Sequence, residues 1–313
     1  MSFPVSNQSE EIDLYHAMQD FLIHLKAAGR SSSTISCYLH DLELLMRTIG
    51  NMRLSRITDR HLEKAVICLR EFSINGAVRT SISLNRIKSA YRSFFKWAFE
   101  SGRVPRNAAA RLYLAKTKSR PTIPITMKEI ISLLDTIRIS DDPLARRDEA
   151  LFAVYAFTGI RRSEALALRI KDYDRVSSTL FLWRTKGGSN RMQPVPLQLA
   201  EILAKYIRRI ERDFKAGDYS PLFFGRHPEK PLSARQAQVR FEKWKNFSGI
   251  RKDLTIHSFR AGFATLLYEA TGDILLVSHA MGHVDIQTTK RYINNNMYGV
   301  RQAIEKIFSQ IVV

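Results

Sequence analysis

Apolar residues recur at helical spacing in four separate stretches of the first hundred residues. The first stretch carries them at Leu14, Met18, Phe21, Leu22 and Leu25. The same spacing of three and four positions returns three more times between residues 35 and 98, with short polar connections. Ser9 is expected to cap the first helix and Gly29 to end it. Four amphipathic helices with short loops predict a small helical domain over residues 8–105.

The rest of the chain is also mainly helical in pattern, with one short segment of strand character. Helical patterns cover 126–137, 146–174 with a break at Thr158-Gly159, 197–214, 234–247, 258–270 and 274–281. The strand signals are "TLFLW" and "RMQPVPL", and Gly187-Gly188 between them predicts a hairpin turn that holds Lys186. We therefore expect a mainly α chain with a small β-sheet, its second domain mixed α/β over 125–297. An amphipathic helix is expected to follow over 298–313.

The two expected domains are joined by a basic, proline-containing segment, which we assign as a linker over residues 106–124. The whole chain carries 49 Lys and Arg against 30 Asp and Glu, a net charge of +19, which favours a polyanionic partner such as nucleic acid. Between Arg79 and Arg120, Glu100 is the only acid. A solvated face normally mixes charges of both signs, so this stretch favours a phosphate-contacting surface. Its expected DNA-binding residues are Arg79, Arg86, Lys88, Arg92, Lys96, Lys116 and Lys118.

Composition argues against a membrane protein, a secreted protein and a metal-binding protein. No apolar run reaches the roughly 18 residues that span a bilayer, and the N-terminus lacks the layout of a signal peptide. A soluble, cytoplasmic protein with no membrane partner is expected. Cys37 and Cys68 both lie in helical patterns, where we expect them to be small core residues rather than a disulfide. No Cys and His cluster has metal-ligand spacing, and no metal or other cofactor is expected.

Three short stretches in the second domain combine residues that could carry chemistry. They are "TGIRRSEALAL" with Arg161 and Glu164, "IHSFRAGFAT" with His257 and Arg260, and "MGHVDIQTTKRYIN" with His283 and Tyr292. The three-residue spacing in each of the first two puts both side chains on one helical face. Each stretch alone is more often an ordinary polar surface than a site, and a lone tyrosine near a helix end is usually structural.

Together with Lys186, these residues suit attack on a phosphodiester. Two guanidiniums can hold the extra negative charge of a phosphorane transition state. A tyrosine hydroxyl has a pKa of about 10, so nearby cations and an imidazole that accepts its proton would help it attack. A lysine in a hairpin turn could protonate the departing 5′ oxygen. A covalent phosphotyrosine would keep the bond energy, so rejoining would need neither ATP nor metal.

With these residues in this order, the chain resembles the tyrosine recombinase (phage integrase) family. Arg260 and His283 are 23 positions apart and His283 and Tyr292 are nine apart, which fits the family pattern. The likeness covers nearly the whole chain, including a helical core-binding domain at the N-terminus, and is to the compact, Xer-like members. Two family positions that are often His are Ala261 and Asn294 here. These departures affect the subfamily assignment and not the chemistry.

The resemblance implies a role for each residue. Tyr292 would attack the scissile phosphate and form a 3′-phosphotyrosine, while Arg161 and Arg260 hold the phosphate. Lys186 would act as the general acid, His257 would assist proton transfer, and His283 would donate a hydrogen bond to the phosphate. Glu164 would support Arg161 without touching the phosphate.

The resemblance also implies partners. These are double-stranded DNA with inverted-repeat core sites, and a homotetramer, one dimer per site, that exchanges strands through a Holliday junction. Residues 298–313 would dock on a neighbouring protomer, with packing on their own domain as the alternative. A nucleoid-associated location would follow. Two other functions stay open: a type IB topoisomerase-like nicking-closing enzyme, and a DNA-binding protein without catalysis.

Overall fold

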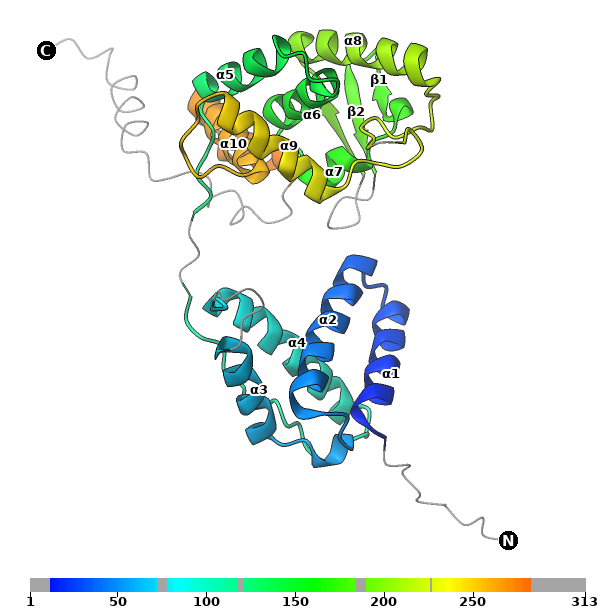
Figure 1. Ribbon diagram of the computed structural model, residues 1–313, viewed down its shortest axis with the longest axis vertical. Coiled ribbons are helices and arrows are strands. Elements are labelled where there is room, and N and C mark those ends of the chain that lie inside the picture. The colour runs from blue at the N-terminus through cyan, green and yellow to red at the C-terminus, as the bar shows by residue number, and fades with distance from the viewer. Residues whose placement is uncertain (1–11, 72–77, 118–120, 184–189, 226, 283–313) are drawn as a thin grey trace, which may run out of the picture. The chain divides into compact units, whose positions relative to one another are not determined.

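The computed structural model describes residues 12–71, 78–117, 121–183, 190–225 and 227–282. The chain divides into two compact units, residues 1–119 and 120–313, and each is described by itself. The hairpin turn at Gly187-Gly188 and the helices expected near Tyr292 and over 298–313 lie outside the described residues. Both units are built mainly of helices, and the second also contains a small sheet (Figure 1).

The described part of the first unit contains four α-helices. They are α1 (Leu14–Ala27), α2 (Ser32–Ile49), α3 (Asp59–Glu71) and α4 (Ser81–Glu100), with a 3₁₀ turn η1 (Leu54–Arg56) before α3. Helix α2 packs against the other three, and α4 contributes Tyr91, Phe94 and Phe95 to the core. The expected cap at Ser9 is wrong: Asp13 caps α1, and its carboxylate accepts a hydrogen bond from the His16 N–H at 2.9 Å.

Part of the segment that the sequence analysis treated as linker packs into this first core. Ala108, Ala109 and Leu112 are buried against the helices. Beyond them, the Asn85 side chain exchanges two hydrogen bonds of 2.8 and 2.9 Å with the backbone of Ala115. Small and apolar residues at irregular spacing bury themselves without forming a helix, which a periodicity search does not detect.

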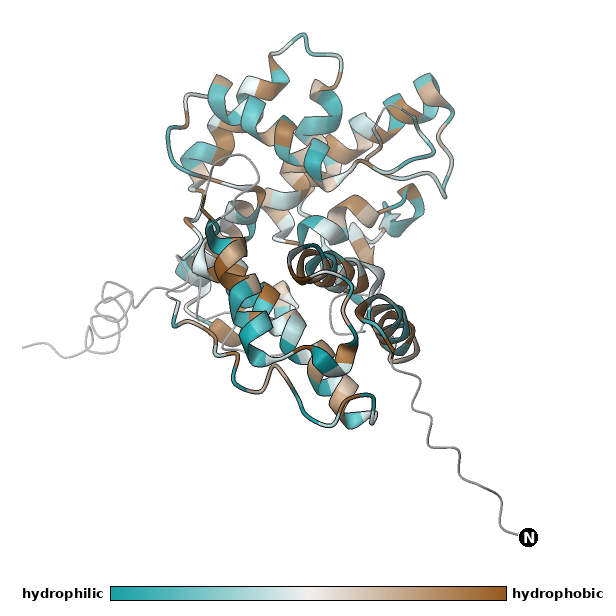
Figure 2. Ribbon diagram, turned by 60° about the horizontal axis from the view of Figure 1, so that its bottom comes forward, coloured by the Kyte–Doolittle hydropathy of each residue, from teal (hydrophilic) through white to brown (hydrophobic). Residues whose placement is uncertain are grey.

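The expectation that both cysteines are core residues is also wrong. Cys37 is exposed on α2 and Cys68 is half-buried on α3. Each lies at a position where the helix turns from its apolar face toward solvent, so neither contributes to the core. Hydrophobic and hydrophilic residues alternate along the helices (Figure 2). Among the described helices, none is long and apolar enough to cross a membrane.

The second unit is assembled around a buried helix. Its elements are α5 (Met127–Arg138), α6 (Ala145–Thr158), α7 (Arg162–Ala167), η2 (Ile170–Asp172), β1 (Tyr173–Asp174), β2 (Thr179–Leu182), β3 (Arg191–Pro194), α8 (Leu197–Phe214), α9 (Ala234–Phe247), α10 (Ile256–Thr271) and α11 (Ile274–Met281). The strands form an antiparallel sheet in the order β1-β2-β3, and Leu182 on β2 pairs with Arg191 on β3. The mainly helical fold with a small sheet is therefore confirmed.

Helix α6 is buried on nearly all sides, between α5, α8 and α10. Phe152 on α6 stacks on Phe259 of α10, with ring centroids 6.0 Å apart and planes within 9°. The buried Asp148 accepts hydrogen bonds from Arg147, from Arg240 and from the Trp244 indole N–H at 2.7 Å. These contacts fix the first turn and the middle of α6 in the core, and its last residue, Thr158, begins the "TGIRRSE" motif.

Candidate active site

The Thr158-Gly159 break places Arg161 where two helices meet. Helix α6 ends at Gly159, which adopts a left-handed conformation with φ of 61°. A β-carbon at this position would lie 2.3 Å from the Phe263 ring of α10, so only glycine allows this close approach. The chain then turns, and Arg161 occupies the position immediately before α7.

Arg161 is held by Glu164, one helical turn further on. The Glu164 carboxylate accepts the Arg161 backbone N–H and its guanidinium Nη1, both at 2.8 Å. Burial alone would raise the pKa of Glu164. The hydrogen bonds from Arg161 and the positive charges of Arg191 and Arg161 outweigh burial and lower that pKa below its ordinary value. Glu164 is therefore a carboxylate at neutral pH, and it orients the Arg161 guanidinium.

Arg260 reaches the same place from α10. Its side chain is 5% exposed, and its guanidinium donates to the carbonyls of Gly159 and Met281, each at 2.6 Å. Arg161 donates to the carbonyl of Gly282, the next residue, at 3.3 Å. The two arginines of separate motifs, 99 positions apart, thus meet at the C-terminal end of α11.

The end of a helix presents carbonyl oxygens without intrahelical partners and a partial negative charge. These carbonyls accept hydrogen bonds from Arg161 and Arg260. A phosphate oxygen carries a full charge and is a stronger acceptor than a carbonyl. The two guanidiniums can therefore exchange a carbonyl for a phosphate without losing hydrogen bonds.

His257 lies one turn before Arg260 on α10, and its side chain remains accessible to solvent. Partial burial of the ring, and then the positive charges of Arg162 and Arg260, lower the pKa of His257 below its ordinary value of about 6.5. The imidazole is neutral at pH 7. A neutral imidazole beside two guanidiniums can accept a proton.

A third arginine of the cluster, Arg191, was not among the residues predicted from the sequence. It lies at the start of β3 and donates to Glu164 Oε2 at 3.2 Å, to Gln193 Oε1 at 2.6 Å and to the Ala280 carbonyl at 2.8 Å. Arg191 and Gln193 occupy alternate positions, which face inward on this strand. In the sequence, these two polar residues at inward positions of a short strand mark an unusual site. That pattern does not identify the residues that they contact.

The other three candidate residues, Lys186, His283 and Tyr292, lie outside the described residues. Their neighbours in the chain are described. Lys186 falls between the paired strands β2 and β3, and β3 begins with Arg191. His283 follows Gly282, whose carbonyl accepts the Arg161 hydrogen bond.

The basic residues expected to contact DNA in the first unit divide into two groups. Three have partners within the unit: Arg79 donates to the Leu69 carbonyl, Arg86 to the buried Asp41, and Lys88 to the Tyr113 carbonyl. Arg92, Lys96 and Lys116 are exposed, and Lys96 lies 3.6 Å from Glu100. Lys118 lies outside the described residues. Burial raises the pKa of the Asp41 carboxyl, and the hydrogen bond and positive charge of Arg86 oppose part of that rise.

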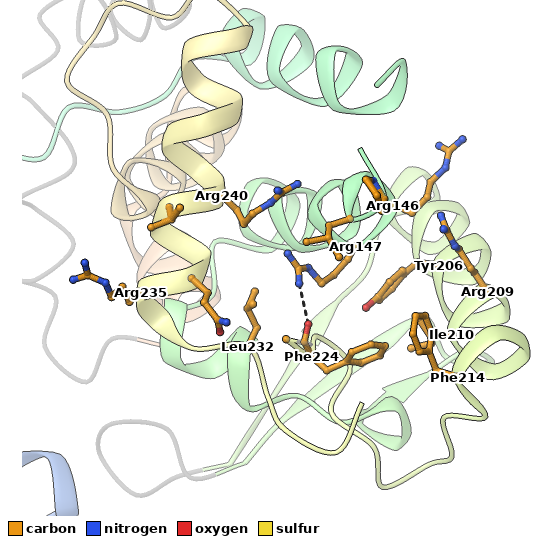
Figure 3. A pocket seen from close by; sticks show the side chains of 15 residues that line it. Arg146, Arg147, Tyr206, Arg209, Ile210, Phe214, Phe224, Leu232, Arg235 and Arg240 are labelled. Carbon is orange, nitrogen blue, oxygen red and sulfur yellow. Dashed lines mark hydrogen bonds between the residues drawn. The ribbon is translucent and has the colours of Figure 1, made fainter. Parts of the chain in front are cut away.

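A cavity of about 470 Å³ lies elsewhere in the second unit, between α6, α8 and α9 (Figure 3). Apolar residues such as Phe214, Phe224 and Leu232 share its lining with five arginines, and Arg147 donates to the Phe224 carbonyl at 3.0 Å (Figure 3). Four of these arginines are paired with carboxylates of Asp142, Asp148, Glu149 and Asp213. None of the candidate site residues that the structure describes lines this cavity. Within the described part of the chain, no group of His, Cys, Asp and Glu has the arrangement of a metal site.

Comparisons with known proteins identify the family of this chain. Residues 124–298 match the model of the phage integrase family, and residues 18–102 match that of the phage integrase N-terminal SAM-like domain. Tyrosine recombinase XerC of Chromobacterium violaceum is 30% identical over 276 residues, which cover 88% of this chain and 89% of the relative. XerC of Alcanivorax borkumensis is 25% identical over 95% of both chains.

Solved structures share the fold. A lambda integrase dimer bound to a COC′ core site has a TM-score of 0.71 at 18% identity, covering 94% of this chain and 82% of that one. The XerH recombinase bound to its difH substrate has a TM-score of 0.66 at 22% identity, covering 92% and 82%. The protein therefore belongs to the phage integrase family and is an Xer-like tyrosine recombinase, an enzyme class that carries out site-specific recombination of DNA.

Proposed function

We propose that this protein cleaves and rejoins DNA at specific sites through a 3′-phosphotyrosine formed on Tyr292. The observation that supports this most strongly is the meeting of Arg161 and Arg260 at the end of α11, with the neutral His257 one turn away from Arg260. Two guanidiniums at one place match the requirement of a phosphoryl transition state for added positive charge.

The reaction begins when the scissile phosphate replaces the carbonyls of Met281 and Gly282 as acceptor for the two arginines. The Tyr292 hydroxyl oxygen attacks phosphorus, the bond from phosphorus to the 5′ oxygen breaks, and the tyrosyl proton passes to His257. Lys186 protonates the departing 5′ oxygen. His283 donates a hydrogen bond to a non-bridging oxygen. Rejoining is the same sequence in reverse, with a 5′ hydroxyl as nucleophile.

The same proposal includes the assembly on DNA. Two dimers, each on a core site with inverted repeats, form a homotetramer that exchanges strands through a Holliday junction. In support, lambda integrase, which shares this fold, has been solved as a dimer on a core site and as a tetramer on a Holliday junction. The net charge of +19 and the exposed cations Arg92, Lys96 and Lys116 favour contact with DNA backbone. Residues 298–313 dock on the neighbouring protomer in this assembly.

The test needs a DNA site, which binding itself can provide. The Tyr292→Phe variant should bind DNA without cleaving it, so it can select sites from a random pool. A nicked suicide duplex carrying the selected site is then offered to the wild type. We expect a covalent protein–DNA adduct with the wild type, none with Tyr292→Phe, and normal adduct formation with Tyr219→Phe, whose exposed tyrosine lies on the same unit.

Three outcomes separate the functions. Absence of any adduct with the wild type would leave only DNA binding. An adduct together with relaxation of a plasmid that lacks the selected site would favour a topoisomerase-like enzyme. Site-dependent adducts followed by exchange between two site-bearing duplexes would support recombination.

A further inference from the structure

Arg191 joins three parts of the site that are distant in sequence. It begins β3, and its guanidinium reaches Glu164 on α7 and Ala280 on α11. The Ala280, Met281 and Gly282 carbonyls therefore each accept a hydrogen bond from a different arginine, Arg191, Arg260 and Arg161 respectively. Arg191 and Arg161 also bind the same carboxylate, that of Glu164.

The charges explain why that sharing matters. Glu164 is buried and ionised, and its two oxygens bind Arg161 and Arg191. If Arg161 were its only partner, the negative charge of Glu164 would offset the positive charge that Arg161 offers to a phosphate. Arg161, Arg191 and Arg260 together carry three positive charges against the one negative charge of Glu164, so these four side chains have two positive charges in excess. A phosphodiester carries one negative charge and its pentacoordinate transition state carries two, which matches this excess.

The shape of the site also depends on Arg191. Its Nη1 donates to Gln193 and Ala280 while its Nη2 donates to Glu164, so the planar fork of a guanidinium is used in two directions. The backbone of Gly282 lies against this side chain. A β-carbon on Gly282 would stand 2.7 Å from Arg191 Nε and 2.8 Å from its Cδ. The residue before His283 is therefore packed directly on the Arg191 guanidinium.

We infer that Arg191 is a positioning residue for strand cleavage: it shares the charge of Glu164 and supports the end of α11, so that Arg161 keeps its place and its charge for the phosphate. The inference rests on the proposed phosphotyrosine chemistry. Arg191 itself does not touch the DNA in this arrangement. Burial lowers the pKa of Arg191, and the nearby Glu164 charge opposes that effect, so the guanidinium stays protonated at neutral pH.

The test compares Arg191→Gln and Arg191→Lys with Arg175→Gln as control, because Arg175 is half-exposed and pairs with Glu211 on the surface. Each variant is offered three suicide duplexes. One has an ordinary scissile phosphate, one has sulfur in place of the 5′ bridging oxygen, and one has a neutral methylphosphonate. Sulfur needs no general acid to leave, and a methylphosphonate carries no charge for an arginine to hold. DNA affinity and melting temperature are measured alongside.

We expect Arg191→Gln to slow adduct formation about 10- to 100-fold on the ordinary phosphate, since small misplacements of catalytic groups have effects of this size. The dissociation constant for DNA should change by no more than about twofold. The loss of cleavage rate should persist on the duplex with the bridging sulfur, because that duplex still carries a charged phosphate for Arg161 to hold. It should shrink on the methylphosphonate, which has no such charge. Arg191→Lys should recover part of the rate by keeping the charge, and Arg175→Gln should match the wild type.

Gly282→Ala provides a second route if Arg191→Gln folds poorly. It displaces the Arg191 side chain without removing it, and its control is Gly272→Ala, which has a similar φ of 68° and nothing within 4 Å. We expect Gly282→Ala to reproduce the substrate pattern of Arg191→Gln, and Gly272→Ala to leave the rate ratio between substrates unchanged.

Several results would overturn the inference. These are a wild-type rate for Arg191→Gln, recovery on the bridging sulfur, which would place Arg191 on the path to the general acid, or an equal loss on all three substrates. A wild type that forms no adduct at all would instead refute the proposed function, so the two failures are distinguishable.

Discussion

Replacing Glu164 with glutamine tests the electrostatic reasoning about the site. The carboxylate accepts three hydrogen bonds: from the Arg161 backbone N–H, from the Arg161 guanidinium and from Arg191. Glutamine has the same shape, but it offers only one acceptor oxygen and places an amide donor opposite a guanidinium. Its neutral side chain also leaves two neighbouring arginines without their shared counter-ion.

The expected cost follows from these contacts. Each charge-assisted hydrogen bond contributes about 1.5–3 kcal/mol, and breaking a buried ion pair costs about 3–5 kcal/mol. Because the Arg161 side chain is 23% exposed, water offsets part of the loss, and we expect about 2–4 kcal/mol. For a unit of this size, roughly 2–4 °C of melting temperature corresponds to each kcal/mol. Glu164→Gln should therefore melt about 4–16 °C below the wild type.

Three measurements check this prediction. Thermal melting at neutral pH gives the deficit, with Glu211→Gln as control because that carboxylate pairs with Arg175 at the surface. Bound DNA should reduce the deficit, since a phosphate supplies the missing anion. Cleavage should slow while DNA affinity holds or rises, because two arginine charges are released.

The deficit in melting temperature should also depend on pH. Since folding lowers the pKa of Glu164, its stabilisation is present above the pKa of the unfolded state and disappears as pH falls through the pKa of the folded state. The deficit should therefore vanish in acid. A variant with the melting temperature and cleavage rate of the wild type would refute the reasoning.

Two further substitutions test the surroundings of the arginines. Arg162→Gln removes a positive charge that lowers the pKa of His257, so that pKa should rise. The pH below which the cleavage rate falls, set by protonation of His257, should therefore move upward. An unchanged pH profile would contradict the assignment of His257 as proton acceptor. Gly159→Ala should destabilise the second unit by more than about 1 kcal/mol beyond Gly272→Ala, because both glycines have positive φ but only Gly159 faces Phe263, at 2.3 Å. Melting curves of the two variants decide this, and the smaller Phe263→Ala should relieve part of the Gly159→Ala deficit.

Local patterns predicted the helices of the second unit well. The segments 197–214, 234–247 and 274–281 were assigned from apolar spacing and match α8, α9 and α11. A helix with one apolar face carries its own signal in sequence, because that face must be buried whatever it packs against. The break at Thr158-Gly159 was found for a similar reason, since glycine ends a helix through its own backbone preference.

Sequence patterns do not reveal contacts between residues that are distant in the chain. Arg86, expected from its charge to contact DNA, also binds Asp41, which lies 45 positions earlier and is buried. The spacing of Cys37 and Cys68 suggested core positions, but both lie at the margins of their apolar faces. Charge and helical spacing do not identify which surface another helix will cover.

The residue types needed for phosphotyrosine chemistry and their order can be read along the chain, as can the helix that carries His257 and Arg260. That Arg161 and Arg260 share the end of α11, and that Arg191 contacts Arg161 through Glu164, follows from packing between distant segments. The physical reason is that helical periodicity comes from burial of one face of a single segment. A guanidinium, in contrast, takes its position from carbonyls and carboxylates that folding brings from other segments of the chain.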